Sequence, residues 1–487
     1  GLAAGTDANT RALAARARLL SRWDQIDNLS EAELDEMAWE LNIIWYDSTA
    51  SIKAKREVIR NSDRVYAKLG TRYAVEQIVT DYFGTGQVRE WNEYGGEPHH
   101  FKVLSDNPEL VNNNLELFLK LLGTVKRRSS WLDAILICLT GEMYLYSGMA
   151  DVVAELGDTT LNPALEAIWN DVMDKKIHIN GGLGAVPGIE GFGPEYVLPN
   201  KDTYDETCAA VGNVFFNYRM FLMSGEAKYV DVAEVALYNN VLAGVNLEGN
   251  KFFYVNVLEA DGKKPFNHGR AGRSPWFGTA CCPSNMARLI PQISGMTYSY
   301  SDDDIYTAFY AGNSTVVPLA AGDVALKQTT DYPFDGKVTI EVNPAEAGQE
   351  FTMWLRIPTW CGEQFIPGKL YSYADNNKSK VVATVNGERV RTAVVDGYMP
   401  VKRAWKAGDK VELELPMPVR YSVADERVEA DVNRVCITRG PLVYCAEQPD
   451  NEFVASTYIV DNIGDQGEVA TFSEGIMSGI NNITLKS

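Results

Sequence analysis

The sequence predicts a multidomain α+β protein made of three successive parts. We expect a small α/β module over residues 1–142, a helical region over 143–302 and a β-sandwich region over 303–487. Two changes of pattern carry this division. The first is a change in composition near Glu142, within a part of the chain where helical periodicity dominates. The second lies near Asp303, after which a period-two alternation replaces the helical periodicity.

The N-terminal module opens with helical patterns. Residues 7–45 are expected to be helical, and Ser30 with Glu33 forms an S-x-x-E capping box. Two further helical patterns run over 51–70 and 71–84, and each ends at a glycine, which suits a helix C-terminus. The start of the chain is therefore predicted to be helical.

The rest of the module combines strands with one helix. Two alternating runs within residues 87–105, joined by Gly95 and Gly96, predict a hairpin. Residues 108–130 predict a helix, and residues 131–139 predict a closing strand.

The segments KREVIRNSDRVYAKLGTRYAVEQIVTDYFG and VREWNEYGGEPHHFKV carry a resemblance to a known family. The stretch from about Arg11 to Ile135 resembles phage tail protein I, a baseplate component, and the resemblance implies a structural role without catalysis. His99 and His100 are neighbours in a predicted strand and should face opposite sides. We interpret them as surface or packing residues, because no cysteine or further histidine lies near them in the sequence.

The central region begins with helices over residues 143–177, interrupted between Gly157 and Asn162. A glycine-rich stretch follows at 181–193. Its G-x-G lacks the third glycine of the dinucleotide-binding spacing, and no strand precedes it. The sequence therefore argues against a nucleotide-binding loop here.

Four side chains in this region have the composition of a tetrahedral zinc site: Glu206, Cys208, Cys281 and Cys282. A disulfide between the adjacent pair is disfavoured, because neighbouring Cα atoms lie about 3.8 Å apart, below the roughly 4.4 Å of unstrained bridges. Pro283 and the apolar spacing after it place this pair just before a helix, where free N–H groups favour a thiolate. The alternative interpretation is that the three cysteines are buried as small apolar residues.

From about Met143 onward the chain resembles glycoside hydrolase family 127, the β-L-arabinofuranosidase family. The matching segments are MYLYSGMADV, EGFGPEYVLPN, DETCA and TACCPSNMARLI. The resemblance implies a zinc ion held by Glu206, Cys208, Cys281 and Cys282. It also implies that Cys281 is the nucleophile and that Glu190 is the general acid/base.

These roles agree with the chemistry of retaining glycosidases, which need a nucleophile and an acid/base carboxyl about 5 Å apart. A thiolate would replace the usual carboxylate and form a thioglycosyl intermediate, and zinc would keep its sulfur deprotonated. Glu190 competes with Glu195, further along the same loop, and a solvated loop glutamate is the alternative. His178 and His268 are candidates for binding sugar hydroxyls, and a packing role is an equal alternative.

After about Asp303 the sequence consists of short alternating runs separated by Gly, Pro and Asn turns. Asn386-Gly387 is a strong hairpin signal within this region. One or two β-sandwiches are therefore predicted, as the resemblance also implies.

The chain departs from the family before Met143. There the family carries the first half of a toroid of paired helices, an (α/α)6 barrel, and here the phage-like module stands in its place. The family's histidine just before this point is Cys138 in this sequence. We therefore expect a partial toroid, which leaves an apolar helix face uncovered and removes part of the sugar pocket.

Composition limits the possible partners. The net charge of −20 argues against a nucleic-acid partner, and no run of 18 or more apolar residues is present to span a membrane. No signal peptide is visible, so a soluble protein of the cytoplasm or periplasm is expected. Seven cysteines without a regular pattern argue against a disulfide framework.

Three functions agree with these features. The first is a zinc-dependent retaining glycoside hydrolase that releases terminal β-L-arabinofuranose, or a related pectin sugar, from plant-type oligosaccharides or glycoconjugates. The second is a non-catalytic baseplate protein with a carbohydrate-binding β-sandwich. The third is a purely structural zinc site, whose loss would unfold the chain. The resemblance from Met143 onward favours the first.

Overall fold

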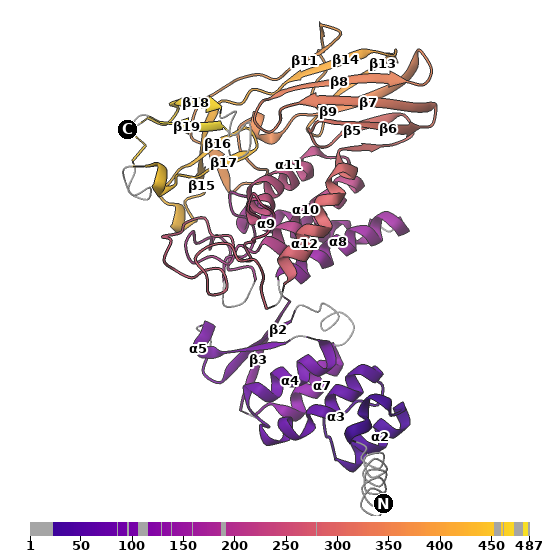
Figure 1. The fold of residues 1–487 in the computed structure, drawn as a ribbon, viewed down its shortest axis with the longest axis vertical. Coiled ribbons are helices and arrows are strands. Elements are labelled where there is room, and N and C mark those ends of the chain that lie inside the picture. Colours follow the sequence, from indigo (N-terminus) through magenta and orange to yellow (C-terminus); the bar gives the residue numbers. More distant parts are fainter. Residues whose placement is uncertain are drawn as a thin grey trace, which may run out of the picture. The chain divides into compact units, whose positions relative to one another are not determined.

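The chain forms two compact units, residues 1–142 and residues 143–487 (Figure 1). The structure is a computed structural model. It describes residues 23–84, 86–94, 97–105, 115–127, 129–137, 139–157, 159–186, 191–278, 280–451, 459–460, 462–471 and 481–485.

The first unit combines helices with one small sheet. Its helical elements are η1 (Trp23–Asn28), α2 (Glu31–Glu40), α3 (Ile52–Ala67), α4 (Arg72–Phe83), α5 (Trp91–Tyr94) and α7 (Leu115–Val125). Its strands are β1 (Gln87–Glu90), β2 (His100–Ser105) and β3 (Trp131–Ile137). Strand β2 pairs antiparallel with β1 and parallel with β3. The predicted hairpin and closing strand are therefore confirmed, with α5 as an addition.

The predicted capping box is present at the start of α2. The Ser30 backbone N–H donates to the Glu33 carboxylate at 2.8 Å, and the Ser30 side chain accepts from the backbone in return. The helix ends at Glu40 rather than at residue 45, so the predicted C-terminal end was wrong. Asn42 adopts a left-handed φ of 51°, which turns the chain and buries Trp45 in the core. Residues 7–22 of that prediction lie outside the described residues.

The core of the first unit lies among α3, α4, α7 and the sheet. Val58 and Ile59 of α3, Ile78 of α4, Phe118 of α7 and Val103 of β2 are all buried in one apolar cluster. This packing, rather than helix propensity alone, holds helices of this length together.

The second unit begins with helices. They are α8 (Leu139–Leu156, which starts just before the boundary), η2 (Thr159–Leu161), α9 (Asn162–Lys175), α10 (Thr207–Ser224), α11 (Ala227–Ala236), η4 (Leu237–Val241), η5 (Leu242–Gly244), α12 (Cys281–Leu289) and η6 (Ile290–Met296). The predicted break after the first helix is confirmed, since Gly157 adopts a φ of 65° that favours glycine.

Strands make up most of the remainder. Two sheets form layers (Figure 1). The six-stranded sheet has the order β12 (Glu388–Arg389), β11 (Val382–Val385), β14 (Asp409–Glu414), β8 (Lys337–Pro344), β7 (Gly322–Thr330), β6 (Asn313–Leu319), and the four-stranded sheet the order β13 (Tyr398–Trp405), β9 (Gln349–Arg356), β5 (Asp304–Thr307), β4 (Tyr298–Tyr300). Strand β7 buries alternate residues, as the period-two pattern predicts.

The turn between β11 and β12 follows the predicted hairpin signal. Asn386 and Gly387 have φ values of 52° and 83°, the left-handed conformation that a two-residue hairpin turn requires. The predicted β-sandwich region is therefore confirmed.

Smaller sheets complete the C-terminal part. A second four-stranded sheet has the order β10 (Tyr371–Tyr373), β15 (Val419–Ala424), β16 (Cys436–Arg439), β17 (Leu442–Tyr444), and β18 (Glu468–Thr471) pairs with β19 (Asn481–Thr484). Short 3-10 turns lie between strands at η7 (Thr359–Cys361), η8 (Glu429–Asp431) and η9 (Gln448–Asp450).

A buried ion-pair cluster joins the helices to the sandwich. Arg356 at the end of β9 donates to Asp231 of α11 at 2.5 Å and to Glu234, and all three side chains are at most 3% exposed. The Arg356 Nε atom also donates to the Ala308 carbonyl at 2.6 Å. This cluster fixes α11 against the sheet, and α11 packs beside α10.

Within the described residues, no helix is both long and apolar enough to cross a bilayer.

Candidate functional site

The four side chains with the composition of a zinc site lie together in the second unit. One ligand atom from each of Glu206, Cys208, Cys281 and Cys282 lies within 4.8 Å of every other. Within the part of the chain that the structure describes, no other group of three or more His, Cys, Asp or Glu side chains is placed to hold a metal ion.

Two helix N-termini bring these residues together. Glu206 is the N-cap of α10 and Cys208 lies in its first turn. Cys281 and Cys282 are the first two residues of α12, so this helix begins earlier than Pro283, where the sequence predicted it to start. All three thiols therefore lie at the positive end of a helix dipole, which stabilises thiolates.

The geometry of the cluster suits one small cation. The Sγ atoms of Cys208 and Cys282 are 3.0 Å apart, and those of Cys281 and Cys282 are 3.8 Å apart. The Glu206 Oε1 atom lies 3.7 Å from the Cys281 sulfur. Cys208 and Cys282 are fully buried, whereas Cys281 is partly exposed. Three sulfurs and one carboxylate oxygen within 4.8 Å of one another could hold one metal ion, and this donor set is one that zinc accepts.

The thiols do not titrate alike. Hydrogen bonds with Cys208 and Cys282 lower the pKa of Cys281 to about 3, and a hydrogen bond with Tyr254 adds to this effect. Burial raises the pKa of Cys208 and of Cys282 above the ordinary thiol value. Among the three thiols, Cys281 is therefore the one that ionises most readily, and it is also the one that is partly exposed.

A buried carboxylate positions Glu206. Asp205, directly before it, is fully buried and accepts hydrogen bonds from the side-chain amides of Asn180 and Asn240, each at 2.9 Å. The Glu206 backbone N–H donates to the Leu183 carbonyl at 3.0 Å. Burial raises the pKa of Asp205 to about 7. The sequence pattern gave no signal for this network, because its members come from separate segments.

The glycine-rich stretch serves this network. A Cβ atom on Gly182 would lie 1.8 Å from the Asp205 carboxylate and 2.2 Å from the Asn240 amide. Gly181 has a φ of 78° and would meet the backbone of Ala236 at 2.6 Å. Glycine is therefore required here for close packing.

Aromatic side chains line the cysteine cluster. The ring of Tyr254 lies 4.2 Å from that of His268 and 5.5 Å from that of Phe277. Tyr254 also joins the apolar cluster that contains Cys208 and Cys282. His268, predicted as a sugar-binding residue, contacts Tyr254, which packs against this cluster, and sugar binding by His268 stays a prediction. Sequence reasoning did not identify Tyr254.

His178, the other predicted sugar-binding residue, is only 2% exposed. Its Nε2 atom lies 3.0 Å from the Thr203 hydroxyl, which donates its own hydrogen to the Gly184 carbonyl. The histidine nitrogen therefore carries the hydrogen and donates to Thr203. Burial lowers the pKa of His178 to about 4, so the ring is neutral at pH 7. Sugar binding by His178 stays a prediction.

The structure describes only one of the two candidate acid/base glutamates. Glu190 lies outside the described residues. Glu195 is 54% exposed and pairs with Lys175 at 2.6 Å. An exposed, ion-paired carboxylate at the surface is not enclosed in a site, as a general acid would be.

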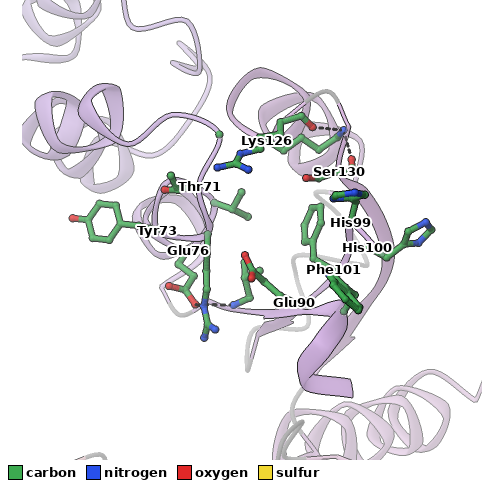
Figure 2. Close-up of a pocket in the computed structure, with 15 residues that line it drawn as sticks. Thr71, Tyr73, Glu76, Glu90, His99, His100, Phe101, Lys126 and Ser130 are labelled. Atoms are coloured by element: carbon green, nitrogen blue, oxygen red, sulfur yellow. Dashed lines mark hydrogen bonds and ion pairs between the residues drawn. The ribbon is translucent and has the colours of Figure 1, made fainter. Parts of the chain in front are cut away.

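A separate cavity of about 530 Å³ lies in the first unit (Figure 2). Two charged groups in its wall already have partners: Arg72 contacts Glu76 at 2.9 Å, and Lys126 donates to the Ser130 carbonyl at 2.7 Å. His99 and His100 also line it, and their rings point in different directions (Figure 2). The cavity brings together no set of ligands comparable with the cysteine cluster.

Comparisons with known proteins divide the chain between residues 126 and 130, a little before the boundary of the two units. Residues 130–295 match the family model for the GH127 β-L-arabinofuranosidase catalytic domain, 304–417 its middle domain and 419–480 the family 127 C-terminal domain. Residues 2–126 match the phage tail protein model Tail_P2_I.

Individual relatives agree with the family models. A non-reducing end β-L-arabinofuranosidase of Bifidobacterium longum subsp. longum is 32% identical over 351 residues, which make up 70% of this chain. The chain spans 50% of that relative's length.

Solved structures give the same result. A GH127 β-arabinofuranosidase superposes with a TM-score of 0.67 at 34% identity, covering 88% of this chain and 68% of the other. The GH127 β-L-arabinofuranosidase Ara127N from Geobacillus stearothermophilus T6 superposes with a TM-score of 0.58 at 29% identity, covering 80% and 65%.

Proposed function

Since this chain belongs to glycoside hydrolase family 127, we propose that it hydrolyses terminal β-L-arabinofuranosides with Cys281 as the nucleophile. The observation that carries the proposal is the state of this sulfur. Cys281 is the partly exposed member of the cysteine cluster, and its neighbours lower its pKa to about 3. A thiolate that is both ionised and accessible can attack a sugar carbon.

The proposed cofactor is one zinc ion held by Glu206, Cys208, Cys281 and Cys282. Support comes from the donor set and from ligand atoms within 4.8 Å of one another. When bound, zinc would supply the positive charge that keeps all three sulfurs ionised at neutral pH. Three thiolates and a carboxylate overcompensate that charge, which leaves the Cys281 sulfur nucleophilic.

The proposed reaction retains the configuration of the sugar. The Cys281 sulfur forms a bond to the anomeric carbon while the bond to the leaving oxygen breaks, and Glu190 gives that oxygen a proton. In the second step Glu190 takes a proton from water, the water oxygen bonds to the anomeric carbon, and the carbon–sulfur bond breaks. The sugar leaves and the Cys281 thiolate is restored.

Residues around the cluster would orient the sugar. Tyr254 packs beside Cys281, and its ring lies 4.2 Å from that of His268 with the two planes tilted by 50°; such ring faces and polar edges suit a furanose. We assign His268 to a sugar hydroxyl and keep His178 as a weaker candidate, because its Nε2 already donates to Thr203.

The nucleophile is tested with an aryl β-L-arabinofuranoside. The chain should release the aryl alcohol, and Cys281→Ala should abolish the release. Cys436→Ala is the matched control, because Cys436 is a free cysteine of strand β16. Equal turnover by Cys281→Ala and the wild type would contradict the assignment.

The acid/base is tested by leaving-group dependence. Glu190→Gln should lower the rate roughly 10²- to 10⁴-fold for alkyl glycosides. The same substitution should lower the rate far less for aryl glycosides, whose leaving group needs no proton. Glu195→Gln is the control, because Glu195 pairs with Lys175 at the surface. The reverse result would transfer the role to Glu195.

The match of residues 2–126 to a phage tail protein favours a second candidate, a structural baseplate protein whose β-sandwich binds glycans. It predicts glycan binding by the whole chain without hydrolysis and without stoichiometric zinc. Turnover that is lost in Cys281→Ala would exclude it as the sole function.

A further inference from the structure

The Cys208 sulfur has a hydrogen-bond donor that is not itself a ligand. The side-chain Nδ2 atom of Asn285 lies 3.2 Å from the Cys208 Sγ atom. Asn285 is 6% exposed and lies on α12, one turn after Cys281 and Cys282. The contact therefore links the two helices that supply the thiols.

The orientation of this amide is fixed by a second residue. Arg288, one turn further along α12, donates from its guanidinium to the Asn285 Oδ1 atom. A guanidinium has donors but no acceptor, so it selects the oxygen of the amide and leaves the NH₂ group facing the sulfur. An N–H donor aimed at the sulfur occupies one of its lone pairs and so fixes the direction in which the others point.

We propose that Asn285 is a positioning residue of the metal site, which orients the Cys208 sulfur toward the other three ligands, and that Arg288 fixes its amide. The proposal rests on the metal part of the proposed function. It separates the roles of two cysteines. Cys208 is fully buried and accepts a hydrogen bond from the Asn285 amide, whereas Cys281 is partly exposed and is the proposed nucleophile.

The test uses the full chain loaded with Co²⁺, whose sulfur-to-metal charge-transfer band reports on the thiolate ligands. Asn285→Ala should shift this band to longer wavelength, because the sulfur lone pairs lose a stabilising hydrogen bond. It should also weaken Co²⁺ binding roughly 10- to 100-fold, the usual cost of losing an outer partner of a ligand. Asn285→Asp keeps the size and the contact with Arg288 but places a carboxylate against the sulfur, so its effect should be at least as large.

Two further variants separate positioning from general loss of packing. Asn217→Ala removes another buried asparagine, which lies on the same helix as Cys208. Its side chain accepts a hydrogen bond from the Trp169 indole at 2.7 Å. This substitution should lower stability and leave the band in place. Arg288→Met keeps Asn285 but releases its amide, so we expect a smaller shift in the same direction.

An unchanged band and affinity in both Asn285→Ala and Asn285→Asp would overturn the proposal, as would an equal shift in Asn217→Ala. If Asn285→Ala does not fold, the proposal is tested with Asn285→Asp and with Arg288→Met, since Arg288 lies at the exposed end of this series of contacts. The measurement needs no substrate. A chain that binds Co²⁺ and shows these shifts without hydrolysing arabinofuranosides would contradict the proposed activity and leave this inference standing.

Discussion

The Sγ atoms of Cys208 and Cys282 lie 3.0 Å apart, although 74 positions separate the two residues in the sequence. Both are free cysteines, and their separation exceeds the about 2.05 Å of a disulfide bond. The contact joins the N-terminal turns of α10 and α12. Two buried sulfurs at this distance, with a third sulfur and a carboxylate beside them, form a ready set of metal ligands.

Removing one buried ligand should remove the metal. Cys208→Ser should reduce zinc from close to one ion per chain to a small fraction after dialysis against a chelator. The loss of a ligand should cost more than the roughly 10- to 100-fold in affinity that an outer partner costs. Elemental analysis of the purified chain measures this. Cys436→Ser should retain the zinc, and equal metal content in the two variants would contradict the site.

The close packing of Gly182 against Asp205 predicts a large effect of one methyl group. Gly182→Ala places a Cβ atom 1.8 Å from the Asp205 Oδ1 atom, so the network that holds Glu206 must move. We expect a loss of about 3 kcal/mol or more in the stability of the second unit, together with weaker zinc binding.

Gly148→Ala is the matched control for this change. Gly148 lies in α8, where a Cβ atom meets nothing within 4 Å. Alanine should raise stability there by up to about 1 kcal/mol. Thermal unfolding followed by circular dichroism compares the two variants, and similar transitions would show that the close contact is easily relieved.

The ion-pair cluster between α11 and β9 predicts a strong dependence on Arg356. Arg356→Met leaves the carboxylates of Asp231 and Glu234 buried without their cation, which typically costs roughly 3–5 kcal/mol. Adding Asp231→Asn and Glu234→Gln to Arg356→Met should recover part of that loss, because the buried charges are then gone.

An exposed pair provides the comparison for Arg356. Arg427 pairs with Asp425 at 2.7 Å at the surface, so Arg427→Met should cost less than about 1 kcal/mol. Urea unfolding of both variants measures the difference. A similar small loss for Arg356→Met would mean that the buried cluster contributes little to stability.

His178 predicts a specific dependence of stability on pH. Burial lowers its pKa to about 4 from 6.5, so between these values the unfolded chain binds a proton that the folded chain does not. Stability should therefore fall as the pH drops from about 6.5 to about 4, by about 3 kcal/mol at about 1.4 kcal/mol per pH unit.

The His178→Gln variant isolates this effect. Glutamine can still donate to Thr203 but does not titrate, so the stability of the wild type minus that of the variant should rise with pH over this range. Taking the difference removes the contributions of other groups, including Asp205, whose raised pKa acts in the opposite direction. A difference that does not vary with pH would show that the ring is protonated in the folded state.

The sequence determined the features that depend on short-range pattern. The capping box at Ser30, the hairpin turn at Asn386 and the alternation along β7 all follow from neighbours a few positions apart, and all are present in the structure. The ligand types at Glu206, Cys208, Cys281 and Cys282 were also apparent, because thiols and carboxylates identify themselves by their chemistry.

Only the tertiary structure decided which of these side chains meet and what supports them. Asn285 bonds to a sulfur 77 positions away, and Arg356 pairs with carboxylates 122 and 125 positions away. Asp205 accepts hydrogen bonds from side-chain amides of two other segments. Such contacts leave no periodic trace in the sequence, because they are fixed by the packing of helices and sheets whose mutual placement depends on the whole core of the unit.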